Sequence, residues 1–293
     1  MIILAPGGIG NQLFSLAFAL YLSERNKFKI SVFSNSRELV MAFQEKSNAS
    51  EKFQNVKMVF GRSRNSCLSR MNGKVNNSCL MRNKSLENFV SRFVTVQDPE
   101  FIPMELIKDN AKTPFLVSGF FQNASFIESL SESIKSFLGD LITDSSNRIE
   151  TKSTGDSRLV GVHIRRGDYI KIPEYGILSM DYFARNLNDV GKEGDKVIVA
   201  SDDLEVLHDF VSLRDVEILT PNIYSPLETM RRLTASKVFI MSNSTFSFWI
   251  GWLVSLRGGI VIRPNPWFKQ SNVSENYLFL NRFLNSPSEF EIM

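Results

Sequence analysis

A short apolar run that ends abruptly in charge is the feature that most constrains this chain. Residues 159–164, Leu-Val-Gly-Val-His-Ile, are rich in β-branched side chains, and Arg-Arg-Gly-Asp-Tyr follows directly at 165–169. The run is short and lies between Gly155 and Gly167, which favours a buried strand over a helix. The charges therefore come at the carboxyl end of a strand, and in an open α/β sheet that edge binds ligands.

Two adjacent arginines at this strand end predict an anionic ligand. Arg165 and Arg166 would be costly to bury without partners, and their guanidinium groups suit the oxygens of a diphosphate. His163 and Asp168 complete the block. The alternative is a surface cluster of ion pairs in which Asp168 pairs with one arginine, because charged clusters at strand ends often have only a structural role. This stretch alone leaves both interpretations open.

Strand and helix patterns alternate along the whole chain. In the second half the expected strands are residues 159–164, 196–200, 217–219, 237–241 and 260–262, and the expected helices begin at 179 or cover 204–210, 225–236 and 246–253. In the first half the expected strands are 2–5, 29–33 and 115–122, and the expected helices are 13–22 and 125–138. Such alternation predicts βαβ units, so the fold class is α/β with parallel sheets.

The length of 293 residues suggests two domains of ordinary size. Residues 143–158 bring Asp, Ser, Asn, Thr, Gly and Lys in quick succession and form the best candidate for a linker. We therefore expect one α/β domain over residues 1–150 and a second over residues 151–293.

A glycine-rich loop follows the first expected strand. Residues 6–12 read Pro-Gly-Gly-Ile-Gly-Asn-Gln, and Gly8 and Gly10 would let backbone amides approach a ligand at a helix N-terminus. A tight turn without a ligand is the alternative. The dinucleotide fingerprint needs a third glycine where this chain has Leu13, and no acidic residue follows the second strand. The sequence thus argues against a nicotinamide cofactor.

Acidic residues follow the strand at 196–200. Asp202 and Asp203 could hold a divalent metal, or could accept hydrogen bonds from a ribose or a guanine edge. The other interpretation is that Ser201 or Asp202 caps the helix that starts at residue 204.

Small hydroxyl residues follow the strand at 237–241. Ser242-Asn243-Ser244-Thr245 stands at the start of a helix, where free backbone N–H groups and hydroxyls can seat a phosphate. The helix that follows, beginning with Phe246, is apolar on every side and should be buried. Asn243-Ser244-Thr245 is also a glycosylation sequon, but a glycan there would obstruct the expected pocket.

Composition narrows the class of protein. A net charge of +3 does not call for nucleic acid, two cysteines exclude a disulfide framework, and two histidines, 163 and 208, are too few for an attractive zinc site. The N-terminus lacks the pattern of a signal peptide, so we expect a cytoplasmic protein. The basic stretch at residues 61–92 is either a solvated loop or a peripheral contact with a membrane or an anionic acceptor.

Four motifs together resemble the α-1,2-fucosyltransferases of glycosyltransferase family 11, in order and spacing over nearly the whole chain. They are Gly-Gly-Ile-Gly-Asn-Gln-Leu-Phe at 7–14, His-Ile-Arg-Arg-Gly-Asp-Tyr at 163–169, Ser-Asp-Asp at 201–203, and Ser-Asn-Ser-Thr-Phe-Ser at 242–247 followed by Trp249. One departure is Phe248, where these enzymes commonly carry tryptophan. The resemblance implies a GT-B fold, with two Rossmann-like domains facing across a cleft.

The resemblance also implies a reaction. The second domain would hold GDP-L-fucose, and fucose would pass with inversion to the 2-hydroxyl of a terminal β-galactoside, without a metal or other cofactor. The oligomeric state is not readable from the sequence.

Roles for particular residues follow from the same resemblance. His163, Arg165 and Arg166 would bind the diphosphate, and Arg165 would stabilise the charge that develops as GDP departs. Asp168 is the nearest acid for the acceptor proton, although pairing with Arg166 or orienting the loop is an equal alternative, as is proton transfer to a phosphate oxygen. The remaining donor-site candidates are Ser244, Thr245 and Phe246, Asp202 and Asp203, and from the first domain Gly8, Gly10, Asn11 and Gln12.

Three rival functions stay open from the sequence. The diphosphate residues do not themselves specify fucose, so a transferase for another GDP-sugar is one. A nucleotide-binding or glycan-binding module without turnover is the second. A metal-dependent transferase that uses Asp202 and Asp203 is the third.

Overall fold

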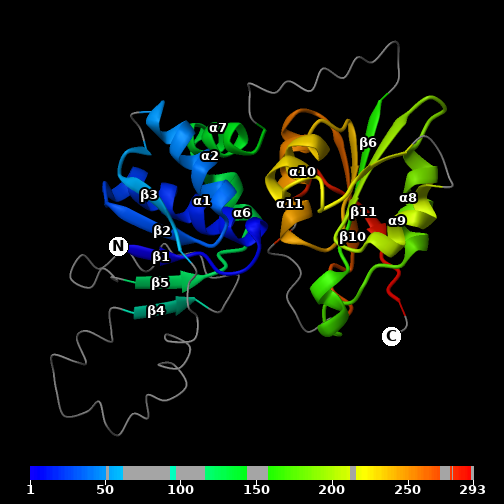
Figure 1. The fold of residues 1–293 in the computed structure, drawn as a ribbon, viewed down its shortest axis with the longest axis horizontal. Coiled ribbons are helices and arrows are strands. Elements are labelled where there is room, and N and C mark those ends of the chain that lie inside the picture. Colours follow the sequence, from blue (N-terminus) through cyan, green and yellow to red (C-terminus); the bar gives the residue numbers. More distant parts are fainter. Residues whose placement is uncertain are drawn as a thin grey trace, which may run out of the picture. The chain divides into compact units, whose positions relative to one another are not determined.

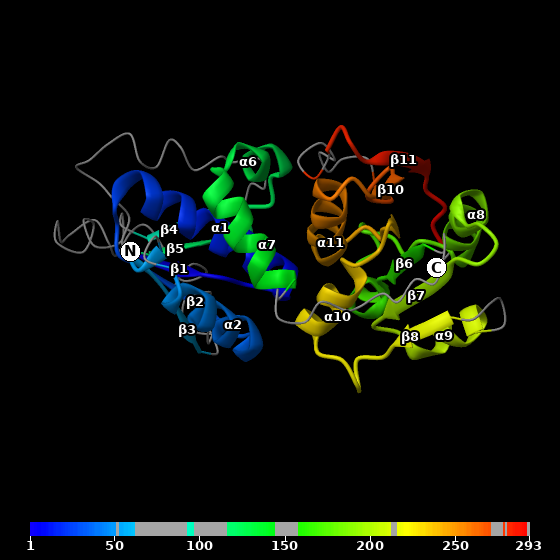
Figure 2. The same cartoon turned by 90° about the horizontal axis from the view of Figure 1, so that it is seen from above.

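The computed structural model describes residues 1–50, 53–61, 93–96, 116–143, 158–211, 216–270, 278 and 280–291. The chain divides into two compact units, Met1–Leu138 and Gly139–Met293, each with its own parallel sheet (Figures 1 and 2). The basic stretch after residue 61 and the interior of the expected linker, residues 144–157, lie outside the described residues.

The first unit is built on a parallel sheet in the order β3-β2-β1-β5-β4. Its strands are β1 (Ile2–Leu4), β2 (Ile30–Ser34), β3 (Val56–Phe60), β4 (Phe93–Val96) and β5 (Leu116–Gly119). Its helices are α1 (Ile9–Asn26), α2 (Arg37–Asn48) and α6 (Ala124–Ser129), and α7 (Glu132–Thr143) begins in this unit and continues past its boundary at Leu138. The expected strands 2–5, 29–33 and 115–122 are therefore confirmed, while β3, β4 and α2 were not predicted.

Two helices of the first unit differ from the sequence prediction. α1 begins at Ile9 rather than at 13, with Gly8 as the residue before its first turn, so the loop proper is only residues 6–8. The expected helix 125–138 is two helices, because the backbone of Leu130 is extended and the Ser131 hydroxyl accepts from the Ile134 N–H at the start of α7. The apolar spacing continues across this break, since Leu130 is itself buried.

The second unit is built on a parallel sheet in the order β11-β10-β9-β6-β7-β8. Its strands are β6 (Leu159–Ile164), β7 (Lys196–Ser201), β8 (Val216–Leu219), β9 (Val238–Ile240), β10 (Ile260–Asn265) and β11 (Leu284–Pro287). Its helices are the 3₁₀ turn η3 (Gly167–Lys171), α8 (Met180–Val190), α9 (Leu204–Val211), α10 (Pro226–Leu233) and α11 (Thr245–Leu256). Figure 2 shows α10 and α11 on one face of the sheet and α8 and α9 on the other.

The core of the second unit confirms the predicted buried strands and the buried helix. Val160, Val162, Val199 and Ile240 are fully covered. α11 packs on β9 and β10, and Phe248, Trp249 and its neighbours through Val254 are buried on every side of the helix. β11 was not predicted, because its sequence Leu-Asn-Ser-Pro has no apolar alternation and it joins the edge of the sheet through its backbone.

Strand order in the second sheet changes direction between β6 and β9. From β6 the chain proceeds to β7 and β8 on one side, and then returns to β9, β10 and β11 on the other side. Connections leaving in opposite directions open a crevice at the carboxyl ends of the two central strands, and ligands of α/β proteins bind there. The same reversal occurs between β1 and β5 in the first sheet.

Candidate active site

The carboxyl end of β6 is joined to the start of α11 through His163. Its Nδ1 lies 2.6 Å from the Ser247 hydroxyl, and its ring centroid lies 4.7 Å from that of Phe246. Burial, and next the charge of Arg165, lower the pKa of His163 from its ordinary 6.5 to about 3. The imidazole is therefore neutral and serves as a hydrogen-bonding group rather than as a cation.

A chain of hydroxyls shapes the first turn of α11. The Ser244 hydroxyl accepts from the Ser247 N–H at 3.2 Å, which makes Ser244 the N-cap of a helix that opens at Thr245. The Ser247 hydroxyl in turn accepts from the Ser242 N–H at 3.2 Å. The sequence reasoning gave Ser247 no role, although the spacing of three residues from Ser244 is typical of an N-cap and its partner.

Asn243 fastens the loop after η3 to this turn. Its Nδ2 donates to the carbonyls of Tyr175 and Gly176 at 3.1 and 3.2 Å, and the Tyr169 hydroxyl donates to the Asn243 carbonyl at 2.9 Å. The Asn243 side chain is fully buried. The amide nitrogen to which a glycan would attach is therefore already engaged inside the fold.

Arg165 lies between two carboxylates. Its Nη2 donates to Asp168 Oδ1 at 2.5 Å, its Nη1 lies 2.8 Å from Asp202 Oδ2, and its guanidinium lies over the ring of Tyr169. About a third of the side chain (31%) is exposed, and Asp168 is more exposed still. Of the alternatives left open for Asp168, pairing with Arg166 is wrong, because the tight 3₁₀ turn brings Asp168 to Arg165, three residues before it.

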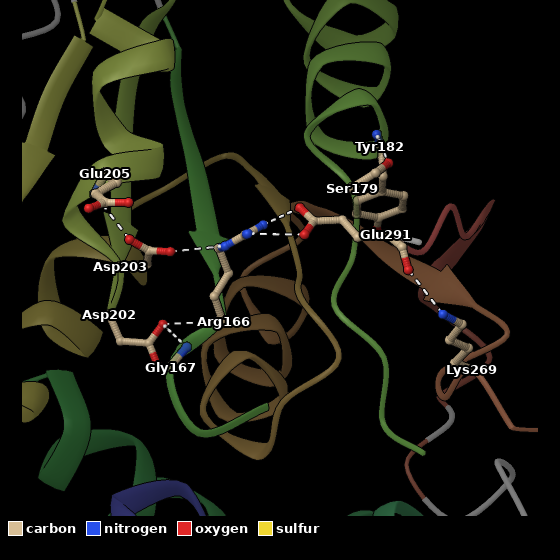
Figure 3. A network of polar contacts seen from close by, with 9 residues as sticks. All are labelled: Arg166, Gly167, Ser179, Tyr182, Asp202, Asp203, Glu205, Lys269 and Glu291. Atoms are coloured by element: carbon tan, nitrogen blue, oxygen red, sulfur yellow. Dashed lines mark hydrogen bonds and ion pairs between the residues drawn. The ribbon is translucent and has the colours of Figure 1, made fainter. Parts of the chain in front are cut away.

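Asp202 organises the backbone of the two arginines. Its Oδ1 accepts from the N–H groups of Arg166 and Gly167 at 2.9 and 3.2 Å, so the end of β7 supports the turn that follows β6 (Figure 3). A Cβ atom at Gly167 would lie 2.3 Å from Asp202 Oδ2. Only glycine therefore fits this turn without displacing the carboxylate.

Asp203, and not Ser201 or Asp202, caps α9. Asp203 Oδ1 accepts from the Glu205 N–H at 3.1 Å, whereas Asp202 is taken up by the turn after β6 and Ser201 accepts from the Asp203 N–H at 3.0 Å. The predicted cap was wrong because the sequence gives no sign of the bonds that Asp202 makes to another strand.

Arg166 is held on both sides by acids (Figure 3). Its Nε donates to Asp203 Oδ2 at 3.0 Å, and its two terminal nitrogens bind the two carboxylate oxygens of Glu291. Hydrogen bonding to Glu291, and to a lesser extent Asp203, raises the pKa of Arg166. Glu291 was not among the predicted site residues, and no motif marks it.

The glycine loop forms a separate polar network in the first unit. Gln12 is buried, and its Nε2 donates to the Gly7 carbonyl at 2.8 Å and to Asn35, while its Oε1 accepts from the Ser34 hydroxyl at 2.5 Å. Gln12 therefore ties the loop to the end of β2.

Asn11 lies at the point where strand order reverses in the first sheet. Its Oδ1 accepts from Gln122 Nε2 at 2.9 Å, which links the loop after β1 to the segment after β5. A Cβ at Gly7, whose φ is +78°, would lie 2.4 Å from Asn11 Nδ2. Gly8 is exposed before the helix, and Gly10 lies buried in its first turn. Asn11 and Gln122 therefore tie the glycine loop to the carboxyl end of β5.

The described residues offer neither a cluster of metal ligands nor a membrane-spanning helix. Within them, no three side chains of His, Cys, Asp or Glu are grouped as a metal ion would need. No helix in this part of the chain is long and apolar enough to cross a membrane.

The structure confirms the expected α/β class, with a parallel sheet in each of two units, and places arginines and a hydroxyl-capped helix at the switch point of the second sheet. The model of glycosyl transferase family 11 matches residues 1–283, and the chain belongs to this family. The membership of glycosyltransferase family 11 that the motifs predicted is thereby confirmed.

Several known proteins are similar to this chain. The O-antigen biosynthesis glycosyltransferase WbnK of Escherichia coli is 29% identical over 194 residues, 57% of this chain and 60% of that protein. An alpha-1,2-colitosyltransferase of Escherichia coli is 27% identical over 171 residues, 53% and 57% of the two chains. These matches span about three fifths of the relatives' length. Among solved structures, the fucosyltransferase NodZ from Bradyrhizobium aligns with a TM-score of 0.48 at 16% identity, covering 85% of this chain and 90% of that one.

Proposed function

We propose that this chain transfers L-fucose from GDP-β-L-fucose to the 2-hydroxyl of a terminal β-galactoside, with inversion at the anomeric carbon. The observation that carries the proposal is the position of Arg165. Its partly exposed guanidinium follows β6 at the switch point of the second sheet and lies over the ring of Tyr169, whose hydroxyl donates to the Asn243 carbonyl just before the hydroxyl-capped start of α11. Cationic donors and a helix N-terminus together suit a diphosphate.

Transfer of fucose from GDP-fucose requires that the departing diphosphate be stabilised. The acceptor oxygen attacks the anomeric carbon, the bond to the β-phosphate oxygen breaks, and the electron pair leaves with GDP. Negative charge grows on that phosphate, and a fixed guanidinium lowers the barrier because it needs little reorganisation. Asp202 and Tyr169 hold Arg165 in place, and the exposed Asp168 is the partner that a phosphate displaces.

Other residues play supporting parts in this proposal. Ser244 and Thr245 present the start of α11 to the diphosphate, with Phe246 packed on His163 behind them. The acceptor proton passes to Asp168 or to a phosphate oxygen. No metal takes part.

The test measures GDP release from GDP-fucose, with and without a terminal β-galactoside, in the presence of a chelator. Acceptor-dependent release in chelator that falls about 100-fold or more in Arg165→Ala supports the proposal, because one preorganised donor is worth about that much. Arg282→Ala is the matched control. Its Nε donates to Ser255 in the last turn of α11, at the other end of the helix from Ser244, so release should be unchanged.

Each other outcome points to a different function. GDP-fucose binding with no release on any galactoside indicates a binding module, and activity lost in chelator indicates a metal. If the protein does not bind GDP, a GDP-sugar is excluded as its donor.

A second candidate donor is GDP-colitose, because one of the similar proteins is an alpha-1,2-colitosyltransferase. Competition between the two donors at equal concentration separates them. Preferential transfer of colitose would replace fucose in the proposal and leave the role of Arg165 intact.

A further inference from the structure

Arg165 and Arg166 are neighbours in sequence but differ in how they are held. Arg165 keeps about a third of its side chain in solvent and contacts the exposed Asp168. Arg166 is only 15% exposed, and its Nε and both terminal nitrogens are used by Asp203 and Glu291. Asp203 takes the Nε–H and Glu291 takes one N–H of each terminal nitrogen, so both two-donor edges of this guanidinium are engaged and a phosphate could reach only single N–H groups unless it displaced a carboxylate.

Glu291 is itself fixed by backbone contacts. Its N–H donates to the Ile177 carbonyl at 2.9 Å, and its carbonyl accepts from Lys269 Nζ at 3.0 Å. Just before it, Phe290 forms an antiparallel bridge with Leu178. The carboxylate therefore approaches Arg166 from a segment that is anchored independently of the arginine.

We infer that Glu291 is a positioning residue of the donor site, and that Arg166 is a clamp rather than a ligand of the diphosphate. This inference rests on the proposed function. Glu291 and Asp203 hold the Arg166 side chain, while Asp202 holds its backbone N–H, so the turn carrying Arg165 is fixed from three points. The clamp leaves Arg165 as the arginine that meets the phosphate.

The direction in which GDP affinity changes when Glu291 is neutralised distinguishes a clamp from a phosphate ligand at Arg166. If Arg166 were a phosphate ligand restrained by Glu291, neutralising Glu291 would release it and also remove a nearby negative charge, so GDP would bind more tightly. If Arg166 is a clamp, the same change loosens the turn of Arg165, and GDP binds more weakly.

The experiment titrates GDP calorimetrically into wild type, Glu291→Gln and Glu289→Gln. Glu289 is the matched control because it lies two residues away and pairs with Arg185 of α8, outside the arginine turn. We expect the Kd for GDP to rise about tenfold in Glu291→Gln, as for other coupled charge networks, and to stay unchanged in Glu289→Gln. The KM for GDP-fucose should rise in parallel while the KM for the acceptor does not, a split that general destabilisation would not produce.

A double-substituted protein tests whether Glu291 acts through Arg166. Arg166→Met alone should show the same loss of GDP affinity, and adding Glu291→Gln to it should change nothing further. Unchanged or tighter GDP binding in Glu291→Gln, or an additive loss in the double variant, would overturn the inference. Should Glu291→Gln unfold at the assay temperature, Glu291→Asp, which keeps the charge on a shorter arm, is measured with the same outcomes.

Failure of the inference and failure of the proposed function look different in this experiment. A wild-type protein that does not bind GDP overturns the proposed function, and the inference with it. A wild-type protein that binds GDP, beside a Glu291→Gln variant that binds equally well, overturns the inference alone.

Discussion

Burial decides the charge state of His163, and this has a measurable consequence at the scale of the residue. The pKa of His163 falls from 6.5 to about 3 in the folded protein, so between these values the unfolded chain binds a proton that the folded one does not. The neutral, buried His163 therefore contributes fully to the free energy of unfolding above pH 6.5, and this contribution is lost as the pH falls toward 3.

His163→Gln should therefore flatten the pH dependence of the free energy of unfolding between pH 6.5 and 4.5. The difference in slope from wild type should approach about 1.4 kcal/mol per pH unit, the value for one proton. Denaturant unfolding at several pH values measures it. An NMR titration of the folded protein that places the pKa of His163 near 6.5 would contradict the buried neutral imidazole.

Gly167 is the residue on which the arginine turn depends. Gly167→Ala places a Cβ 2.3 Å from Asp202 Oδ2, so we expect a loss of about 1–3 kcal/mol in stability together with weaker GDP binding. Gly139→Ala is the control, since a Cβ there meets nothing closer than 3.5 Å and alanine favours the helix α7. Thermal unfolding and GDP titration of both variants test this prediction. A Gly167→Ala variant with unchanged stability and unchanged GDP affinity would contradict the predicted clash with Asp202.

At the scale of elements, the start of α11 combines a structural and a proposed binding role, and two N-caps separate them. Ser244 caps α11 and Ser225 caps α10, each accepting an N–H three residues on. Ser244→Ala and Ser225→Ala should each cost about 1 kcal/mol of stability, as N-cap losses do. Only Ser244→Ala should also raise the Kd for GDP. Equal GDP affinity in the two variants would mean that the start of α11 does not meet the diphosphate.

At the scale of the whole molecule, the proposed function assigns the nucleotide to the second unit. Hydrogen exchange with saturating GDP should therefore protect residues 159–171 and 241–250 of the second unit and leave residues 1–26 as they were. Protection of residues 1–26 by GDP alone would contradict this division, and calorimetric titration would first establish saturation.

The sequence alone determined the central strands of both sheets, the buried helix α11 and the motif residues at the ends of these elements. Short β-branched runs and apolar helical spacing predict β6, β7, β9 and the buried α11, because burial of alternate or continuous apolar faces leaves a local pattern. Arg165 and Ser244 could be placed at strand ends for the same reason.

Only the tertiary structure decided which of these residues bind one another. Arg166 and Glu291 are 125 positions apart, and Asp202 turns toward β6 instead of capping its own helix. The strand β11 likewise joins its sheet through backbone pairing with β10, which its side-chain pattern does not announce. Such contacts depend on strand order and on distances through space, which leave no local periodicity, and so a single sequence does not encode them in a readable pattern.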